Sequence, residues 1–287
     1  MPLDFANIVP ENNLRLPDAL TIKYGPAPLL ARFVLEGDKF FRERGVRLQL
    51  RHDFDELVYL NKALTASGAW YDLLRLFSSE YADLTPDNAY WISGEDEHGE
   101  IVLTQAGRVF HWPDTTFADE ARLMFYGGRD IGQRCIVTSE IARQISGWVF
   151  NGGALWIRPD FRRKGFPSVI GRLGRAYSAA RWPLDWATCY VNAKLFARGG
   201  VAESYGYPHV DRSIFFPGSP IGELETVLLY MQPDEIYNDL GKFLSSELSP
   251  QEANWADAKF AASASLRGET VTRISSEAVL QGSTSLS

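Results

Sequence analysis

The chain has 287 residues, of which 45% are hydrophobic and 13% aromatic, enough to bury one substantial core with an appended subdomain. Its net charge is −7 at pH 7 and its pI is near 5.2. Sequence-independent binding of nucleic acid needs a basic face, so the negative net charge argues against a nucleic-acid-binding protein. The same negative field weakly favours a cationic acceptor.

Membrane, secretory and metal signals are absent from the sequence. No apolar run approaches the roughly 20 residues that cross a bilayer, and no basic segment followed by a hydrophobic stretch opens the chain. We therefore expect a cytoplasmic protein without a membrane partner. Cys135 and Cys189 are too few for a disulfide scaffold, and neither lies in a Cys/His cluster, so we expect two buried thiols and no metal site.

Hydrophobic periodicity and turn residues divide the chain into predicted elements. In chain order these are a helix over 28–44, a strand over 46–50, a helix over 54–64, a helix over 70–81, hairpin strands over 89–92 and 101–104, a strand over 153–157, a helix from 167, a strand over 186–191, a helix over 192–201, strands within 202–216 and 225–231, and a helix over 234–248. Residues 1–26 are irregular. Residues 261–287 have few large apolar side chains to offset the entropy of ordering, so we expect them to be flexible or loosely docked.

Two segments allow more than one interpretation. The turn at residues 94–99 holds His98 among acidic residues, but its position at a hairpin tip favours a solvated turn over a metal ligand set. Residues 111–152 are rich in aromatic side chains, which either shape a pocket for a bulky substrate or pack this segment onto the core. The second interpretation is slightly favoured.

The most informative stretch is the strand at 153–157, the positively charged loop after it, and the helix that follows at once. A helix start leaves backbone N–H groups without intrahelical partners and carries partial positive charge, so this loop is suited to a pyrophosphate. Gly165 lets the backbone approach phosphates and tolerates positive φ. Pro167 removes one amide donor but suits the first helical turn. The alternative is a basic turn that only meets solvent.

The spacing Pro-x-x-Arg-x-x-Gly-x-Pro, formed by Pro159, Arg162, Gly165 and Pro167, resembles the acyl-CoA loop of the GCN5-related N-acetyltransferase (GNAT) superfamily, whose signature is Arg/Gln-x-x-Gly-x-Gly/Ala. Residues 192–201 resemble the Asn…Leu-Tyr-x-x-x-Gly-Phe helix of the same superfamily, at the expected distance. The order and spacing of the two matches, rather than either match alone, carry the resemblance.

The resemblance implies an α/β (α+β) fold with a mixed, mostly antiparallel central sheet flanked by helices, and an N-terminal helical extension. The expected divisions are an extension over 1–43, a GNAT-like domain over 44–232 with an insertion over 110–152, and a C-terminal helix with a flexible tail over 233–287. The implied activity is N-acyl transfer from acetyl-CoA or another acyl-CoA to a small amine or amino-acid-like acceptor. Direct attack in a ternary complex would draw much of its acceleration from proximity and orientation. A homodimer is compatible with the sequence.

The resemblance also assigns the cofactor site. Strands at 154–157 and 188–191 would bind the pantetheine arm, the loop over 162–168 would hold the pyrophosphate, and a strand N–H near Trp156 or Ile157 would stabilise the oxyanion. The implied cofactor-binding residues are Leu155, Trp156, Ile157, Arg162, Arg163, Lys164, Gly165, Phe166, Pro167, Ser168, Asn192 and Phe196.

The departing thiolate needs a proton or tolerance of its charge. Many family members supply a tyrosine where this chain has Phe196, which has no proton to give. Tyr190 and Tyr205 are the nearest alternative donors in sequence, although a structural role fits each equally well. Among candidates for the base, which include Glu203 and Asp211, we place His209 first because its ordinary pKa is nearest neutrality. A surface role is the competing interpretation for each.

Two rival functions remain open on the sequence. Acyl-homoserine-lactone synthases and N-acyl amino acid synthases share this fold and use a longer acyl donor, which an aromatic insertion and an N-terminal helix would suit. A non-catalytic acyl-CoA-binding module is the other, supported by Phe196 and Pro167.

Overall fold

The computed structural model describes residues 14–126, 135–217 and 223–248. Within them, nine strands form one sheet in the order β1-β2-β3-β4-β6-β7-β9-β8-β5. The strands are β1 (Leu14–Arg15), β2 (Arg47–Arg51), β3 (Ala89–Glu95), β4 (Ile101–Trp112), β5 (Ile136–Val137), β6 (Gly147–Ile157), β7 (Trp186–Asn192), β8 (His209–Phe216) and β9 (Leu224–Met231). All neighbouring pairs are antiparallel except β6 and β7, which run parallel.

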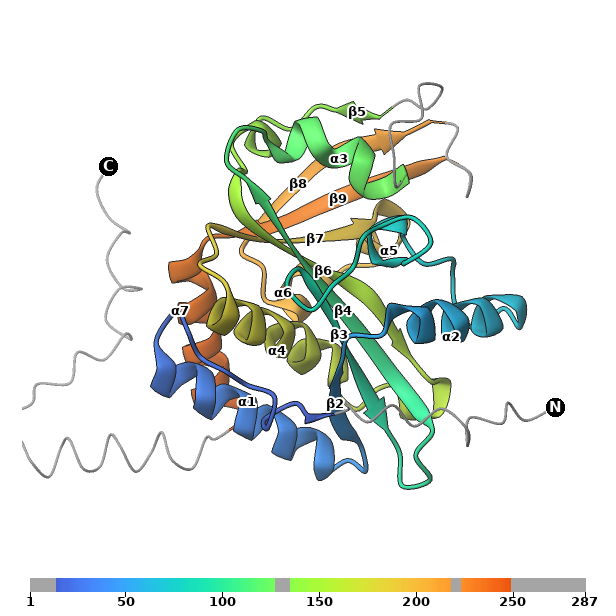
Figure 1. The fold of residues 1–287 in the computed structure, drawn as a ribbon, viewed down its shortest axis with the longest axis vertical. Coiled ribbons are helices and arrows are strands. Elements are labelled where there is room, and N and C mark those ends of the chain that lie inside the picture. The colour runs from blue at the N-terminus through green and yellow to red at the C-terminus, as the bar shows by residue number, and fades with distance from the viewer. Residues whose placement is uncertain (1–13, 127–134, 218–222, 249–287) are drawn as a thin grey trace, which may run out of the picture.

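Helices cover both faces of this sheet, with α1, α4 and α7 gathered on one side and α2 on the other (Figure 1). The α-helices are α1 (Ala27–Arg42), α2 (Phe54–Ala66), α3 (Phe117–Tyr126), α4 (Phe166–Arg181), α5 (Ala193–Phe196), α6 (Val201–Tyr205) and α7 (Pro233–Phe243). Shorter turns of helix are η1 (Arg75–Phe77), η2 (Ile141–Arg143), η3 (Pro159–Phe161) and η4 (Leu244–Leu248). The expected mixed, mostly antiparallel sheet with flanking helices and an N-terminal helix is confirmed.

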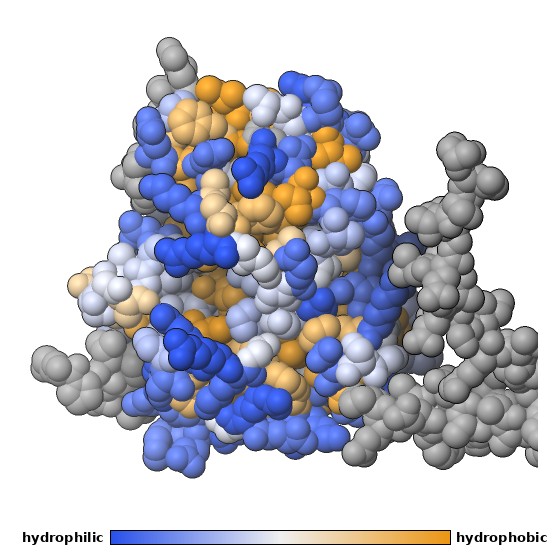
Figure 2. Space-filling view, turned by 180° about the vertical axis from the view of Figure 1, so that it is seen from behind, coloured by the Kyte–Doolittle hydropathy of each residue, from blue (hydrophilic) through white to orange (hydrophobic). Residues whose placement is uncertain are grey.

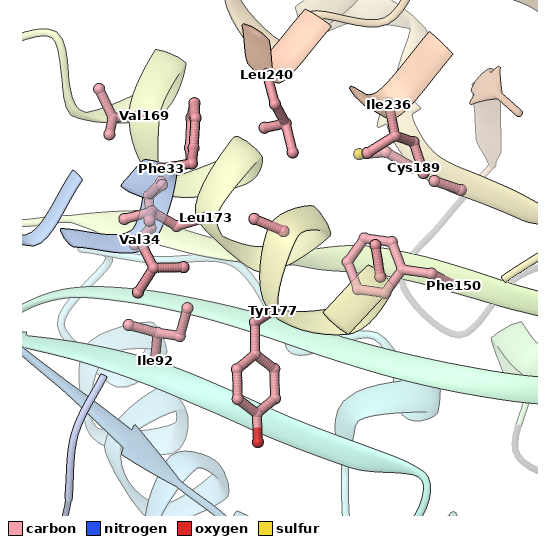
Figure 3. Packing of buried hydrophobic residues seen from close by; sticks show 14 of the residues in the cluster. Phe33, Val34, Ile92, Phe150, Val169, Leu173, Tyr177, Cys189, Ile236 and Leu240 are labelled. Carbon is pink, nitrogen blue, oxygen red and sulfur yellow. The ribbon is translucent and has the colours of Figure 1, made fainter. Parts of the chain in front are cut away.

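The first hydrophobic core lies between the sheet and the layer formed by α1, α4 and α7. Figure 3 shows side chains of α1, α4 and α7 meeting residues of β3, β6 and β7 there. Phe41 of α1 stacks on Phe166, the first residue of α4, with ring centroids 4.7 Å apart. Gly37 allows this close approach, because a Cβ there would lie 2.6 Å from Cδ2 of Leu173. The start of α4 is therefore fixed against α1.

The second core lies on the opposite face, under α2, η1, α3 and η2. Trp91, Phe77 and Phe117 are buried in it. Trp112 packs edge-on against Phe117 with ring centroids 6.1 Å apart, and the ring of Phe117 lies 5.2 Å from that of Tyr190. The aromatic side chains at positions 112 and 117 thus pack onto the core, as the favoured interpretation of residues 111–152 expected.

Four predictions of secondary structure were wrong. The helix predicted over 192–201 is only the four-residue α5, followed by a turn. Residues 70–81 contain only the three-residue turn η1 instead of a helix. Residues 201–205 form α6, so the strand predicted from residue 202 begins only at His209. Gly206 ends α6 with φ of +71°, a left-handed conformation that suits glycine. Strands β4 and β6 are also much longer than the runs predicted at 101–104 and 153–157. The tail over 261–287 lies outside the described residues.

Figure 2 shows the face opposite to that seen in Figure 1, where hydrophilic residues surround smaller apolar areas. Among the helices of the described ranges, none is both long and apolar enough to cross a bilayer. The same ranges contain no group of three or more His, Cys, Asp or Glu side chains placed to hold a metal ion. His98 lies at the exposed tip of the β3–β4 hairpin.

Candidate functional site

The central feature of the sheet is the point where its one parallel pair of strands comes apart. Strands β6 and β7 are paired from Val149 opposite Trp186 to Gly152 opposite Cys189. Beyond Gly152, β6 continues to Ile157 while β7 continues to pair only with β9. The connection between the two strands is α4, so the helix begins beside the segment of β6 that has left its partner.

A β-bulge in β6 accompanies this separation. Thr104 of β4 is opposite Trp156 and Ala106 is opposite Gly153, so two residues of β6 face the single residue between them. Ala154 lies in the bulge with φ of +52°, and its carbonyl accepts a hydrogen bond from the Thr104 hydroxyl at 2.9 Å. The bulge redirects β6 from Ala154, two residues after the last residue paired with β7.

A cavity of about 530 Å³ lies at this end of β6. Its walls come from the end of β6, the loop and first turn of α4, and the segment that follows α2. The lining residues are Gly68, Ala69, Trp70, Tyr71, Leu155, Trp156, Ile157, Phe161, Arg162, Arg163, Lys164, Phe166 and Pro167. Eight of the twelve cofactor-binding residues implied by the resemblance are among them: Leu155, Trp156, Ile157, Arg162, Arg163, Lys164, Phe166 and Pro167.

The backbone of the loop before α4 presents free donors. Within the described ranges, the N–H groups of residues 163–166 donate to no acceptor of the chain. Arg163 and Gly165 have φ of +64° and +78°. Turns of this kind, in which left-handed residues gather successive N–H groups at a helix start, form concave sites for anions. A Cβ on Gly165 would come no closer than 3.4 Å to Phe40, so this glycine is required for its φ and not for lack of space.

The charges of the loop are unevenly compensated. Arg158 is paired with Asp96, Glu100 and Asp160. By contrast, the exposed side chains at positions 162–164 make no ion pair with any described residue. Arg162 donates instead to the carbonyl of Ile157 at 3.1 Å, and the Lys164 amine lies 4.1 Å from the centre of the Phe161 ring. Three cations that make no ion pair with a described residue therefore border these N–H groups.

The remaining implied cofactor residues lie beside the cavity or away from it. Gly165 is the residue just before α4. The Ser168 hydroxyl is 3.2 Å from that of Ser204. Asn192 accepts a hydrogen bond from the N–H of Lys194 and so caps α5. Phe196, at the other end of α5, packs on the first core.

None of the three predicted catalytic residues lines the cavity. Tyr190 faces the second core, and burial raises the pKa of its phenol well above the ordinary value. Tyr205 ends α6; burial raises its pKa as well, with smaller effects from Cys189 and Tyr71. His209 Nε2 is 2.5 Å from Oε1 of Glu235. Its ring also stacks on that of Tyr230, with centroids 5.0 Å apart. Glu203, one of the alternative bases, lies on α6 and not in a strand.

Sequence reasoning missed one wall of the cavity, residues 68–71, because it predicted a break at residues 67–68 and a helix from residue 70. Trp70 packs against Trp156 of β6 with ring centroids 6.0 Å apart, and the Trp156 indole donates to the carbonyl of Ala69 at 3.2 Å. These contacts join the segment after α2 to the end of β6. The only local signal was the aromatic pair directly after the Ser67-Gly68 break.

No protein-family model matches the chain, and no curated protein matches it. Similar solved structures include Arabidopsis thaliana NAA60 in complex with acetyl-CoA (TM-score 0.40, 10% identity, 66% of this chain and 99% of that one). Another is an acetyltransferase of the GNAT family from Streptococcus pneumoniae (TM-score 0.36, 13% identity, 64% and 99%). A third is an uncharacterized protein from Bacillus halodurans (TM-score 0.42, 10% identity, 69% and 90%). Likeness at these scores and identities transfers no activity to the chain.

Proposed function

We propose that this chain is an acyl-CoA-dependent N-acyltransferase of the GNAT type, which transfers an acyl group to a small amine or amino-acid-like acceptor. The observation that carries the proposal is the parting of β6 and β7 next to a cavity whose loop offers four free N–H groups and three unpaired cations. Such a site suits an extended ligand that ends in a diphosphate.

The cavity fits the two parts of coenzyme A differently. The N–H groups of residues 163–166, with Arg163 and Lys164, would hold the pyrophosphate. The edge of β6 beyond Gly152 has lost its strand partner on the β7 side, so its backbone is available to the amides of the pantetheine arm. Leu155 and Trp156 give that region an apolar wall. When bound, the coenzyme supplies the acyl group as a thioester.

The chain would contribute orientation and exclusion of water in the transfer step. Attack of the acceptor nitrogen on the thioester carbonyl is accelerated when the two reactants are held in one geometry. Strand N–H groups near Trp156 and Ile157, next to the bulge, are candidates to stabilise charge on the carbonyl oxygen. His209 lies outside the cavity. It could accept a proton from the acceptor amine only along a chain of water molecules, or from a part of the bound acceptor that extends beyond the cavity.

Two other candidate functions each have one supporting observation. The aromatic wall formed by Trp70 and Trp156 would suit a donor longer than acetyl. Phe196 at the position of the family tyrosine would suit a module that binds acyl-CoA without turnover. A series of acyl-CoA donors of increasing chain length, assayed by mass spectrometry against a broad panel of amines, separates these from the first proposal.

Replacing Gly165 by valine tests the cofactor site directly. A β-branched residue is strained at φ of +78°, so the loop must change its backbone and lose the array of N–H groups. We expect the dissociation constant for CoA, measured by calorimetry, to rise at least about tenfold. Gly45→Val is the matched control, because Gly45 has φ of +75° and open space around it but does not line the cavity. Equal CoA affinity in the two variants would remove the cofactor assignment.

A further inference from the structure

The cavity contains one phenol that the sequence did not single out. Tyr71 lines the cavity, and 59% of its surface is exposed, so solvent or a ligand in the cavity reaches it. The predicted donors Tyr190 and Tyr205 do not line the cavity, and Phe196 has no hydroxyl. Among the lining residues, Tyr71 is the only one with an O–H group.

The backbone that carries Tyr71 is held on both sides. Asn61 of α2, only 5% exposed, donates through Nδ2 to the carbonyl of Tyr71 at 2.9 Å. Its Oδ1 accepts from the N–H of Leu73 at 3.0 Å. On the other side, Ala69 accepts the hydrogen bond from the Trp156 indole. The backbone on both sides of Tyr71 is thus fixed by a buried amide and by β6, and the Tyr71 ring meets the neighbouring Trp70 ring edge-on with centroids 6.1 Å apart.

The electrostatic surroundings of Tyr71 keep its phenol protonated. Partial desolvation raises the pKa of the Tyr71 phenol above its ordinary value, and the neighbouring Trp70 indole opposes that shift in part. The phenol therefore carries its proton at neutral pH. Cys189 and Tyr205 are the other titratable groups that interact with it, and the cations of residues 162–164 line the same cavity.

We propose that Tyr71 is a catalytic residue that donates its phenolic hydrogen bond, and then its proton, to the sulfur of the departing thiolate. This inference rests on the proposed function. The acceptor nitrogen forms its bond to the carbonyl carbon, and the carbon–sulfur bond breaks with its electron pair on sulfur. Tyr71 gives its proton to that sulfur. Its phenolate then recovers a proton from the nitrogen, which must lose one to become an amide, directly or through water.

The test needs neither an acceptor nor turnover. A phenol that donates to a thiolate stabilises the charged form, so the thiol of CoA bound to the protein should have a lower pKa than in the Tyr71→Phe variant. The pKa of the bound thiol is measured by the ultraviolet absorbance of the thiolate across a pH series at saturating CoA. A charge-assisted hydrogen bond predicts a rise of about one unit or more in Tyr71→Phe. The dissociation constant for CoA should stay within about twofold, because the neutral thiol gains little from the phenol.

Tyr59→Phe is the matched control, since Tyr59 is 54% exposed and does not line the cavity. It should leave the thiol pKa unchanged. If wild-type protein binds no CoA, the proposed function fails and the role of Tyr71 with it. If CoA binds and the pKa of its thiol is the same in wild type and Tyr71→Phe, the role of Tyr71 is overturned while the cofactor site stands. The same conclusion follows if Tyr71→Phe and Tyr59→Phe shift that pKa equally.

Discussion

Asp239 on α7 accepts two hydrogen bonds, each 2.9 Å long, from the guanidinium of Arg172 on α4. Arg175, one helical turn later, donates to the same carboxylate at 3.1 Å, and its side chain is only 1% exposed. Arg172 also donates to the carbonyl of Ser204 and Arg175 to that of Tyr205. One carboxylate thus pairs with two buried cations, and these contacts tie α4 to both α6 and α7.

Replacing Asp239 by leucine should therefore destabilise the fold strongly. The change leaves two buried guanidinium groups without a counterion, which costs about 3–5 kcal/mol of unfolding free energy. Urea denaturation followed by circular dichroism measures it. Glu140→Gln is the control, because Glu140 and Arg143 form an exposed pair whose loss costs about 1 kcal/mol or less. Similar losses in the two variants would mean that the pairing of Asp239 with the two arginines contributes little to stability.

Arg163 holds a left-handed backbone conformation in the loop before α4, with φ of +64°. For a residue with a Cβ, this conformation costs about 1–2 kcal/mol. Glycine avoids that strain, but its greater freedom in the unfolded chain cancels part of the gain in stability. We expect Arg163→Gly to raise the unfolding free energy by up to about 1 kcal/mol, and to weaken CoA binding through the lost cation. Thermal denaturation and calorimetry give the two results.

Arg162→Gly is the comparison for that variant. Arg162 has φ of −70° and ψ of 165°, an extended conformation that any residue adopts, so glycine there should only destabilise. If Arg163→Gly and Arg162→Gly lose stability by the same amount, Arg163 does not have a left-handed conformation in solution. The array of N–H groups in residues 163–166, which depends on that conformation, would then not form.

Cys189 makes stability depend on alkaline pH. Burial raises the pKa of its thiol to about 12, whereas in the unfolded chain the thiol titrates near its ordinary value. Between those two values the folded state holds a proton that the unfolded state has released. The stability is complete below the unfolded pKa, and it is lost as pH rises toward the folded pKa, by up to about 1.4 kcal/mol per pH unit.

Cys189→Ala removes this contribution and isolates it. At neutral pH the variant should be less stable than wild type, because removing the sulfur leaves a cavity. Above about pH 9 its free energy of unfolding should decrease less steeply with pH than that of wild type. Urea midpoints at neutral and alkaline pH, compared between the two proteins, measure the difference in slope. Parallel curves throughout would show that the Cys189 thiol titrates alike in both states.

The sequence predicted the part of the site that depends only on neighbouring residues. The strand, the basic loop and the helix that begins after Gly165 were predicted from adjacent residues, because a helix start, a positive φ and an apolar strand each depend on nearby side chains. The same holds for α1, and for α2 with its cap Asp53, whose carboxylate accepts from the N–H groups of Asp55 and Glu56. The approximate place of the proposed cofactor loop therefore needed no tertiary information.

The sequence by itself determined which segment is the candidate anion site, since N–H groups at a helix start and positive charge are properties of one continuous stretch. Only the tertiary structure decided which residues form the other walls of the cavity. Residues such as Arg108 and Asn151 extend β4 and β6 because they are cross-strand partners, which their own propensities do not indicate. Tyr71 reaches the cavity because Asn61, ten residues earlier, clamps its backbone where a helix would otherwise be expected. Contacts between distant segments overrode local preference at both places, and these contacts bring the phenol to the cavity.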